Sequence, residues 1–117
     1  MYEFLDDELA ALKQRLLDMS QRAEELVEMA TEALRTRDKE QAELVIAGDR
    51  DVDTLELEVE QLAIELLALQ QPMARDLRFI VSAFRIVGDL ERVGDHAVNI
   101  AQCALRLLAM PAPVSPV

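Results

Sequence analysis

The chain has 117 residues, of which 51% are hydrophobic, 3% aromatic and 30% charged, with three glycines and four prolines. This length provides one hydrophobic core, and the abundance of Ala, Leu and Glu favours long helices over a β-sandwich. The formal net charge of −11 argues against a nucleic-acid-binding protein and against charge-driven docking on anionic lipid, since both require a basic face.

Apolar residues recur at steps of four and three along the first third of the chain. Nine successive positions of this pattern are apolar, namely Leu5, Leu9, Leu12, Leu16, Met19, Ala23, Leu26, Ala30 and Ala33. No glycine or proline interrupts the stripe, and its period is that of a helix packed lengthwise against other helices. The pattern predicts a helix over residues 3–36.

A second helix is expected over residues 39–70. Asp38 is a suitable N-cap residue, and Gln41, three residues later, is its expected capping-box partner. The stripe of this helix comprises Val45, Gly48, Val52, Leu55, Val59, Leu62, Leu66 and Leu69. Gly48 allows two interpretations, because it suits either a tight crossing of two helices or a short kink.

A third helix is expected over residues 72–109, with Pro72 in its first turn. Its stripe comprises Met73, Leu77, Ile80, Phe84, Val87, Glu91, Gly94, Val98, Ala101, Leu105 and Leu108. Residues 110–117 are rich in proline and uncharged, which predicts a linker or tail. Because short connections place long helices antiparallel, the sequence predicts an all-α fold, an up-down-up three-helix bundle over residues 1–109.

Acidic residues interrupt the stripe of the third helix. Glu91 falls on the stripe, and Asp95 follows one helical turn later. A carboxylate on a core stripe is costly unless it is paired or bound to a metal ion. Gly94, which precedes Asp95, removes a side chain from this region and would let a ligand or another helix approach closely.

The second helix carries a matching acidic pair. Asp49 and Asp53 are also one turn apart, and Glu56 and Glu60 continue the same line. Position 53 lies 18 residues before Gln71 and position 91 lies 19 residues after Pro72. Positions 49 and 95 are likewise 22 residues before and 23 residues after these two residues. In an antiparallel helix pair, the two acidic pairs are therefore expected at the same height.

Four carboxylates at one height repel each other unless a cation neutralises them. Oxygen ligands of this kind suit hard cations such as Mg²⁺, Ca²⁺ or Mn²⁺, and also iron in carboxylate-rich sites. The expected metal ligands are Asp49, Asp53, Glu91 and Asp95.

The competing interpretation is a solvated surface with salt bridges. Residues 38–70 contain ten acids and two bases, and a solvated acidic helix face accounts for most of that excess. Arg50, Arg85 or Arg92 would then pair with some of the acids, and the remaining acids would face water. The spacing leaves both interpretations open.

Catalytic arrangements are poorly represented. A ferritin-like di-iron site requires Glu-x-x-His motifs, but the only histidine, His96, is preceded three residues earlier by Val93. As a phosphoacceptor, His96 would have Asp95 beside it, which repels phosphate, and it has no lysine downstream. The sequence contains no glycine-rich phosphate loop, nucleophile elbow or cysteine metal site. We therefore expect a protein that is not an enzyme.

The cysteine content and the N-terminal residues indicate a compartment. Cys103 is the only cysteine, so an intrachain disulfide is impossible, and its position is that of a small core residue. The first ten residues, MYEFLDDELA, contain no basic region followed by an apolar stretch, and no apolar run approaches the ~20 residues that span a bilayer. We therefore expect a soluble, cytoplasmic protein.

Two segments, QQPMARDLR at residues 70–78 and DLERVGDHAVNIA at residues 89–101, resemble the PhoU family of regulators of bacterial phosphate uptake. The similarity extends from about Leu5 to Leu108. It implies three-helix bundles, usually two in tandem, each with acidic motifs implicated in binding metal ions or clusters.

The family motifs match specific positions of this chain. They match Asp49 and Asp53 in the second helix and Glu91 and Asp95 in the third. The resemblance thus implies divalent or ferric metal ions, with iron, manganese, zinc and magnesium as candidates. Asp89 and Asn99 also match adjoining motif positions, and their roles are less defined.

The resemblance also implies a function. Family members act beside the phosphate ABC transporter and a membrane sensor histidine kinase, and they lower phosphate-starvation signalling when phosphate is plentiful. The expected function is therefore that of a metal-binding negative regulator of phosphate transport and phosphate homeostasis, whose partners are the transporter ATPase and the sensor kinase. The alternative is a helical dimerisation or scaffold module without metal.

The sequence departs from the family in containing a single bundle. It is either a one-repeat relative or the first half of a longer protein. One bundle alone is expected to expose apolar surface that a second bundle would cover, so we expect a homodimer. The apolar residues that lie off the main stripes are Leu17, Val27, Leu34, Ile64 and Leu67.

Overall fold

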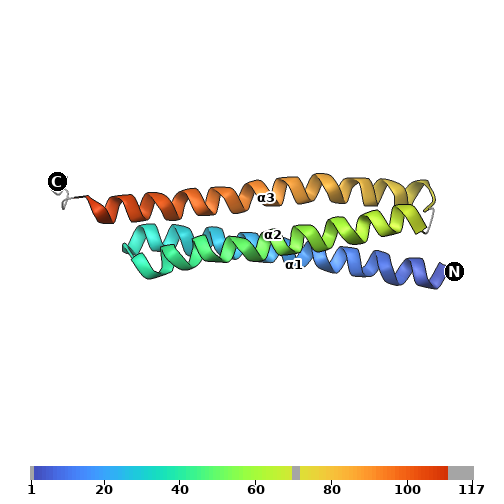
Figure 1. Cartoon of the computed structure of the whole chain (residues 1–117), viewed down its shortest axis with the longest axis horizontal. Coiled ribbons are helices and arrows are strands. Elements are labelled where there is room, and N and C mark those ends of the chain that lie inside the picture. The colour runs from blue at the N-terminus through green and yellow to red at the C-terminus, as the bar shows by residue number, and fades with distance from the viewer. Residues whose placement is uncertain (1, 70–71, 111–117) are drawn as a thin grey trace.

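Three long helices make up the computed structural model, in which residues 2–69 and 72–110 are described. They are α1 (Tyr2–Thr36), α2 (Lys39–Leu69) and α3 (Ala74–Ala109). Each helix packs against the other two and successive helices run antiparallel, forming an up-down-up bundle with extents of 66 × 22 × 16 Å (Figure 1). The predicted all-α three-helix bundle is therefore confirmed.

Three helix ends lie together at one end of the bundle. Figure 1 shows the N-terminal end of α1 there with the C-terminal end of α2 and the N-terminal end of α3. Over the described ranges, none of the helices is long and apolar enough to cross a membrane. The proline-rich segment expected at 110–117 lies outside the described residues, apart from Met110.

The turn from α1 to α2 is closed by local hydrogen bonds. Arg37 has a φ of 59°, and the N–H of Asp38 donates to the Ala33 carbonyl over 2.9 Å. The N–H of Gln41 donates to Asp38 Oδ1 over 3.1 Å, which confirms Asp38 as the N-cap residue. The side chain of Gln41 does not complete a capping box, because it donates instead to the Met29 carbonyl of α1 over 2.8 Å.

The third helix begins later than expected. Met73 is its N-cap residue, with φ −69° and ψ 165°, so the chain is still extended there. Pro72 therefore precedes the helix and does not belong to its first turn. The helix itself begins at Ala74.

The predicted stripe of α1 enters the core completely and that of α2 in part, since Leu55 and Leu62 are only half-buried. All nine apolar stripe residues of α1 are buried. On α2, Val45, Val52, Val59 and Leu66 are buried together with Gly48. A Cβ atom on Gly48 would lie 2.9 Å from Leu26 Cδ2, so this glycine permits a tight crossing between α1 and α2.

The face of α3 that enters the core matches the predicted stripe in part, since its residues Ile80, Val87, Gly94 and Ala101 are buried. Its buried residues are Ile80, Ala83, Val87, Gly94, Ala97, Ala101 and Ala104. Leu77 and Phe84, which were expected in the core, are 40% and 37% exposed. Small side chains fill the narrow space beside α1 and α2, and the larger apolar side chains lie on the flanks of the helix. Because the buried face is rotated, Glu91 is exposed and does not interrupt the core.

Candidate metal centre

The predicted ligands lie together on the seam between α2 and α3. Burial raises the pKa of Asp49, and the negative charges of Asp53, Asp95 and Glu91 raise it further. All three of those carboxylates are thus close enough to act on Asp49. The equal heights predicted for Asp49 and Asp95 agree with the position of Asp49 Oδ1, which is 2.9 Å from where a Cβ atom on Gly94 would lie.

Gly94 of α3 lies against α2 at this height. A Cβ atom on Gly94 would lie 2.9 Å from Asp49 Oδ1 and 3.6 Å from Val52 Cγ1. The carboxylate of Asp49 therefore rests against the backbone of α3. The space that Gly94 leaves is occupied by α2, one of the two occupants that the sequence suggested.

Glu56 also belongs to this cluster. A hydrogen bond to Glu91 raises the pKa of Glu56 to about 7, and burial and the charges of Glu91, Glu60 and Asp53 act in the same direction. If both carboxyl groups are ionised, neither can donate, and the buried Glu56 Oε2 has no hydrogen-bond partner. A proton on Glu56 or a cation beside it would satisfy this oxygen.

Sequence reasoning placed Glu56 on the acidic line but not among the expected ligands. Its spacing of three residues from Asp53 was the available indication, since residues three and four apart share a helix face. The interaction with Glu91 of α3 depends on side-chain conformation, which the spacing does not specify.

Arginine does not neutralise the cluster in the described part of the chain. The ion pairs there join Arg15 to Asp18 and Glu58, Arg22 to Glu25 and Asp51, and Arg35 to Glu32. None of them includes a predicted metal ligand, and Arg50, Arg85 and Arg92 pair with none of these acids within the described ranges.

The donor set suits a hard cation in chemistry and charge. Its ligands are all carboxylate oxygens, one oxygen of Glu56 is buried and unpartnered, and Asp53, Glu91 and Asp95 are exposed. Among the residues that the structure describes, no three Asp, Glu, His or Cys side chains converge closely enough to hold one ion. Coordination would therefore require the exposed carboxylates to rotate toward Asp49 and Glu56.

Two other polar side chains of α3 lie outside the core. His96 is exposed. Cys103 is half-buried, so it is less enclosed than expected, and Arg106 Nη2 donates to its Sγ over 3.1 Å.

Comparison with known proteins identifies similar chains. A family model described as the PhoU domain matches residues 16–104. The phosphate-specific transport system accessory protein PhoU homolog of Aquifex aeolicus is 45% identical over 109 residues, which cover 93% of this chain and 49% of that protein. Proteins of the same name from Clostridium acetobutylicum and Caulobacter vibrioides are 42% and 46% identical over 106 and 101 residues. These matches cover 90% and 86% of this chain, and 48% and 44% of the two proteins. The chain thus spans about half the length of the curated relatives it matches.

Proposed function

Because the chain belongs to the PhoU family, we propose that it is a non-catalytic accessory protein of phosphate-specific transport. The observation that carries this proposal is the 45% identity over 109 residues to an accessory protein of that system. In this role the bundle lowers phosphate-starvation signalling when phosphate is plentiful. It acts in the cytoplasm, by contact with the ATPase of the phosphate transporter and with the sensor histidine kinase.

The proposal includes metal binding by the carboxylate cluster. Asp49, Asp53, Glu91 and Asp95 are the proposed ligands, and Glu56 is added to them. The unpartnered Glu56 Oε2 and the raised pKa of Asp49 support this assignment, because both reflect negative charge without a neutralising partner. A bound divalent or ferric ion would supply the positive charge that relieves repulsion between α2 and α3.

A metal-free scaffold module is the second candidate. The absence of three converging side chains in the described ranges favours it. In that case the acids are solvated, and the bundle acts through its apolar surface. A homodimer, in which a second copy supplies the second bundle, is proposed under both candidates.

Metal analysis separates the two candidates. Protein purified without chelator is assayed for iron, manganese, zinc and magnesium by mass spectrometry, and its thermal unfolding is followed with each added ion. At an ion concentration 100 times the Kd, binding to the folded state stabilises by ~2.7 kcal/mol. We expect Glu91→Gln/Asp95→Asn to lose this stabilisation, and the matched control Asp6→Asn/Asp7→Asn on α1 to keep it. Absence of both bound metal and stabilisation would overturn the metal assignment.

The accessory role is tested in a bacterium that lacks its own PhoU protein. With phosphate plentiful, the expression of a phosphate-starvation reporter is measured with and without this chain. We expect the chain to lower reporter expression. Expression equal to that of cells with the empty vector contradicts the regulatory role, whatever the metal analysis shows.

A further inference from the structure

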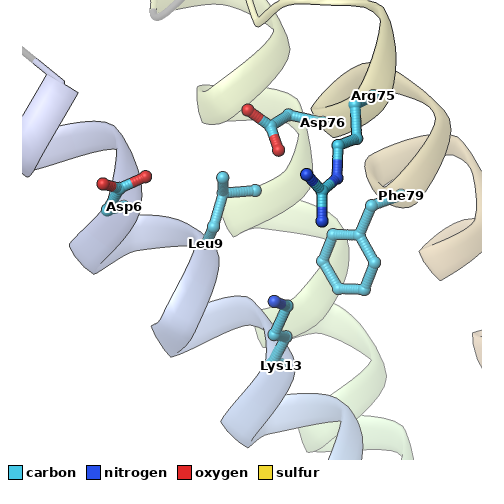
Figure 2. Close-up of a pocket in the computed structure, with 6 residues that line it drawn as sticks. All are labelled: Asp6, Leu9, Lys13, Arg75, Asp76 and Phe79. Atoms are coloured by element: carbon cyan, nitrogen blue, oxygen red, sulfur yellow. The ribbon is translucent and has the colours of Figure 1, made fainter.

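Three adjoining cavities line the surface between α1 and α3. The cavity shown in Figure 2, of about 630 Å³, has Lys13 and Phe79 in its wall. Both residues also line a second cavity of about 310 Å³, which reaches Ser20. Ser20 in turn lines a third cavity of about 450 Å³. These shared walls make one continuous depression, which we name the α1–α3 groove.

The walls of the groove follow a heptad spacing. Lys13 and Ser20 on α1 lie seven residues apart, as do Phe79 and Ile86 on α3, and each pair across the groove lines a common cavity. Val27 and Val93 continue both rows by seven residues and share the third cavity. Because α1 and α3 run in the same direction, their heptad rows lie in register. Heptad rows in register are the arrangement against which further helices pack in coiled coils.

The floor of the groove is apolar and accessible to water. Leu17 is 54% exposed and Ile86 is 40% exposed, and both line the middle cavity. Phe79, Leu90 and Val93 are half-buried beside them. A contiguous apolar surface of this kind is typical of a protein–protein interface.

On α1, the charged residues on the two sides of Ser20 are opposite in sign. On α1, Lys13 lies seven residues before Ser20, and Glu24 and Glu28 lie four and eight residues after it. The end cavity beyond Lys13 also contains Arg75, together with Asp6 and Asp76 (Figure 2).

We propose that a second copy of this chain packs antiparallel in the α1–α3 groove, with Ser20 and Ile86 nearest the two-fold axis. Such an axis places Lys13 of each copy against Glu24 and Glu28 of the partner subunit, so each favourable charge contact occurs twice. It also places Phe79 against Val93 of the partner subunit. A parallel arrangement would instead bring Lys13 against Lys13 of the partner subunit.

The other two seams suit a second copy less well. The α2–α3 seam carries the carboxylate cluster, and a second chain of net charge −11 would add repulsion there. The α1–α2 seam is bridged by ion pairs of Arg22 with Asp51, at 2.9 Å, and of Arg15 with Glu58, at 3.5 Å.

This inference rests on the homodimer included in the proposed function. Two copies also match the length of the relatives, since one copy spans 49% of the protein from Aquifex aeolicus. Packing in the α1–α3 groove leaves the carboxylate cluster of the α2–α3 seam open to solvent, so metal binding and self-association are independent.

Charge reversal tests the interface directly. Sedimentation equilibrium of the full chain is expected to give twice the chain mass of 13.1 kDa. In the proposed dimer, Lys13→Glu brings acids against acids at the facing α1 positions, and Glu24→Lys/Glu28→Lys brings bases against bases there. We expect each variant alone to dimerise at least tenfold more weakly, and an equimolar mixture to form a heterodimer. The α2 reversals Arg50→Glu and Glu40→Lys/Glu43→Lys serve as matched controls and should dimerise normally.

Cross-linking locates the axis independently of charge. In a Cys103→Ser background, Ser20→Cys is expected to form an intermolecular disulfide under mild oxidation, whereas the neighbouring Gln21→Cys, on an exposed face, should not. A monomeric wild-type chain, or a dimer that is indifferent to the groove reversals and does not cross-link at position 20, overturns this inference. A monomer that still binds metal and lowers reporter expression removes the homodimer but leaves the accessory role and the metal assignment standing, so the failures are distinguishable.

Discussion

The two seams on either side of α3 differ in chemistry. On the side of α2, carboxylates crowd together and Asp49 rests against the backbone at Gly94. On the side of α1, cavities expose Leu17 and Ile86. The face of α3 between these seams consists mainly of alanine. One helix with a narrow buried face therefore keeps two wide flanks available for different tasks.

Each seam destabilises the isolated chain in a different way. The acidic seam holds like charges close together, which a proton or a cation relieves. The groove leaves apolar surface in water, which only another apolar surface relieves. The comparison teaches that ions and protein partners should act on this bundle from separate sides of α3.

The largest expected effect is that of a charge in the groove. Ile86→Glu should raise the Kd of self-association at least 100-fold, about 2.7 kcal/mol, because the two-fold axis brings two buried carboxylates together. Val81→Glu is the matched substitution on the same helix, outside the groove, and should change the Kd less than about threefold. Sedimentation velocity over a concentration series measures both values.

Exposure alone gives the opposite order for these two substitutions. Val81 is 54% exposed and Ile86 is 40% exposed. If the partner covered the most exposed apolar residue, Val81→Glu would have the larger effect. That outcome would place the interface on another face of α3 and remove the distinction between the two flanks.

The next effect is a pH dependence of the acidic seam. Because the pKa of Glu56 is raised to about 7, the folded chain binds more protons than the unfolded chain between about pH 4.5 and 7. The contribution of Glu56 to stability is therefore present at low pH and is lost as the pH rises through 7. Because the carboxyl is partly exposed to solvent, the expected loss is on the order of 1 kcal/mol.

Urea unfolding at pH 5, 6, 7 and 8 measures this dependence. We expect Glu56→Gln to be more stable than the wild-type chain at pH 8. We also expect it to lose the part of the pH dependence of stability that Glu56 contributes. Glu43→Gln, an exposed substitution elsewhere on α2, is the control. Equal pH profiles for the two variants would show that the seam carries no uncompensated charge.

A smaller effect distinguishes the two glycines of α3, of which Gly88 is exposed and Gly94 is buried. A Cβ atom on Gly88 would contact nothing within 4 Å, so Gly88→Ala should stabilise by up to ~1 kcal/mol through helix propensity. Gly94→Ala gains the same propensity but displaces the Asp49 carboxylate. We expect its net stability change to be near zero and its metal-induced stabilisation to fall. Equal stabilisation by both substitutions, with metal response intact, would argue against close contact at Gly94.

The smallest effect belongs to the third seam, between α1 and α2. Asp51→Asn removes the contact with Arg22, which joins two partly exposed groups. Such pairs contribute ~0.2–1 kcal/mol, and we expect a value in the lower half of this range from thermal unfolding. Self-association and metal response should not change, since this seam belongs to neither proposed site. A change in either would mean that the seams are coupled.

Periodicity was sufficient to predict the buried face of α1, but only one of the two buried rows of α3, which contains Ile80, Val87, Gly94 and Ala101. Every stripe residue of α1 is buried, because leucines and alanines there follow a single line. On α3, the rule that larger apolar residues are buried favoured Leu77 and Phe84, whereas the buried positions are Ala83 and Ala97. Hydrophobicity increases with size, but a close helix approach requires small side chains, and a single sequence does not state the distance between helices.

The sequence likewise predicted part of the candidate site. Counting from the connection located Asp49 beside Asp95, because both helices rise by the same ~1.5 Å per residue. The effect of Glu91 on the pKa of Glu56 depends on side-chain rotamers, which residue spacing does not specify. Leu17 was recognised as an off-stripe apolar residue, but Ile86, which lines the same cavity, was not.

The slender form of the bundle governs how it moves in solution. With extents of 66 × 22 × 16 Å, a single chain has a high frictional ratio and elutes from a sizing column ahead of a globular protein of equal mass. Pairing along the α1–α3 groove thickens the rod without lengthening it, so the frictional ratio falls as the mass doubles. Helical N–H bonds lie nearly parallel to the long axis, so nuclear spin relaxation at most amides senses end-over-end tumbling alone.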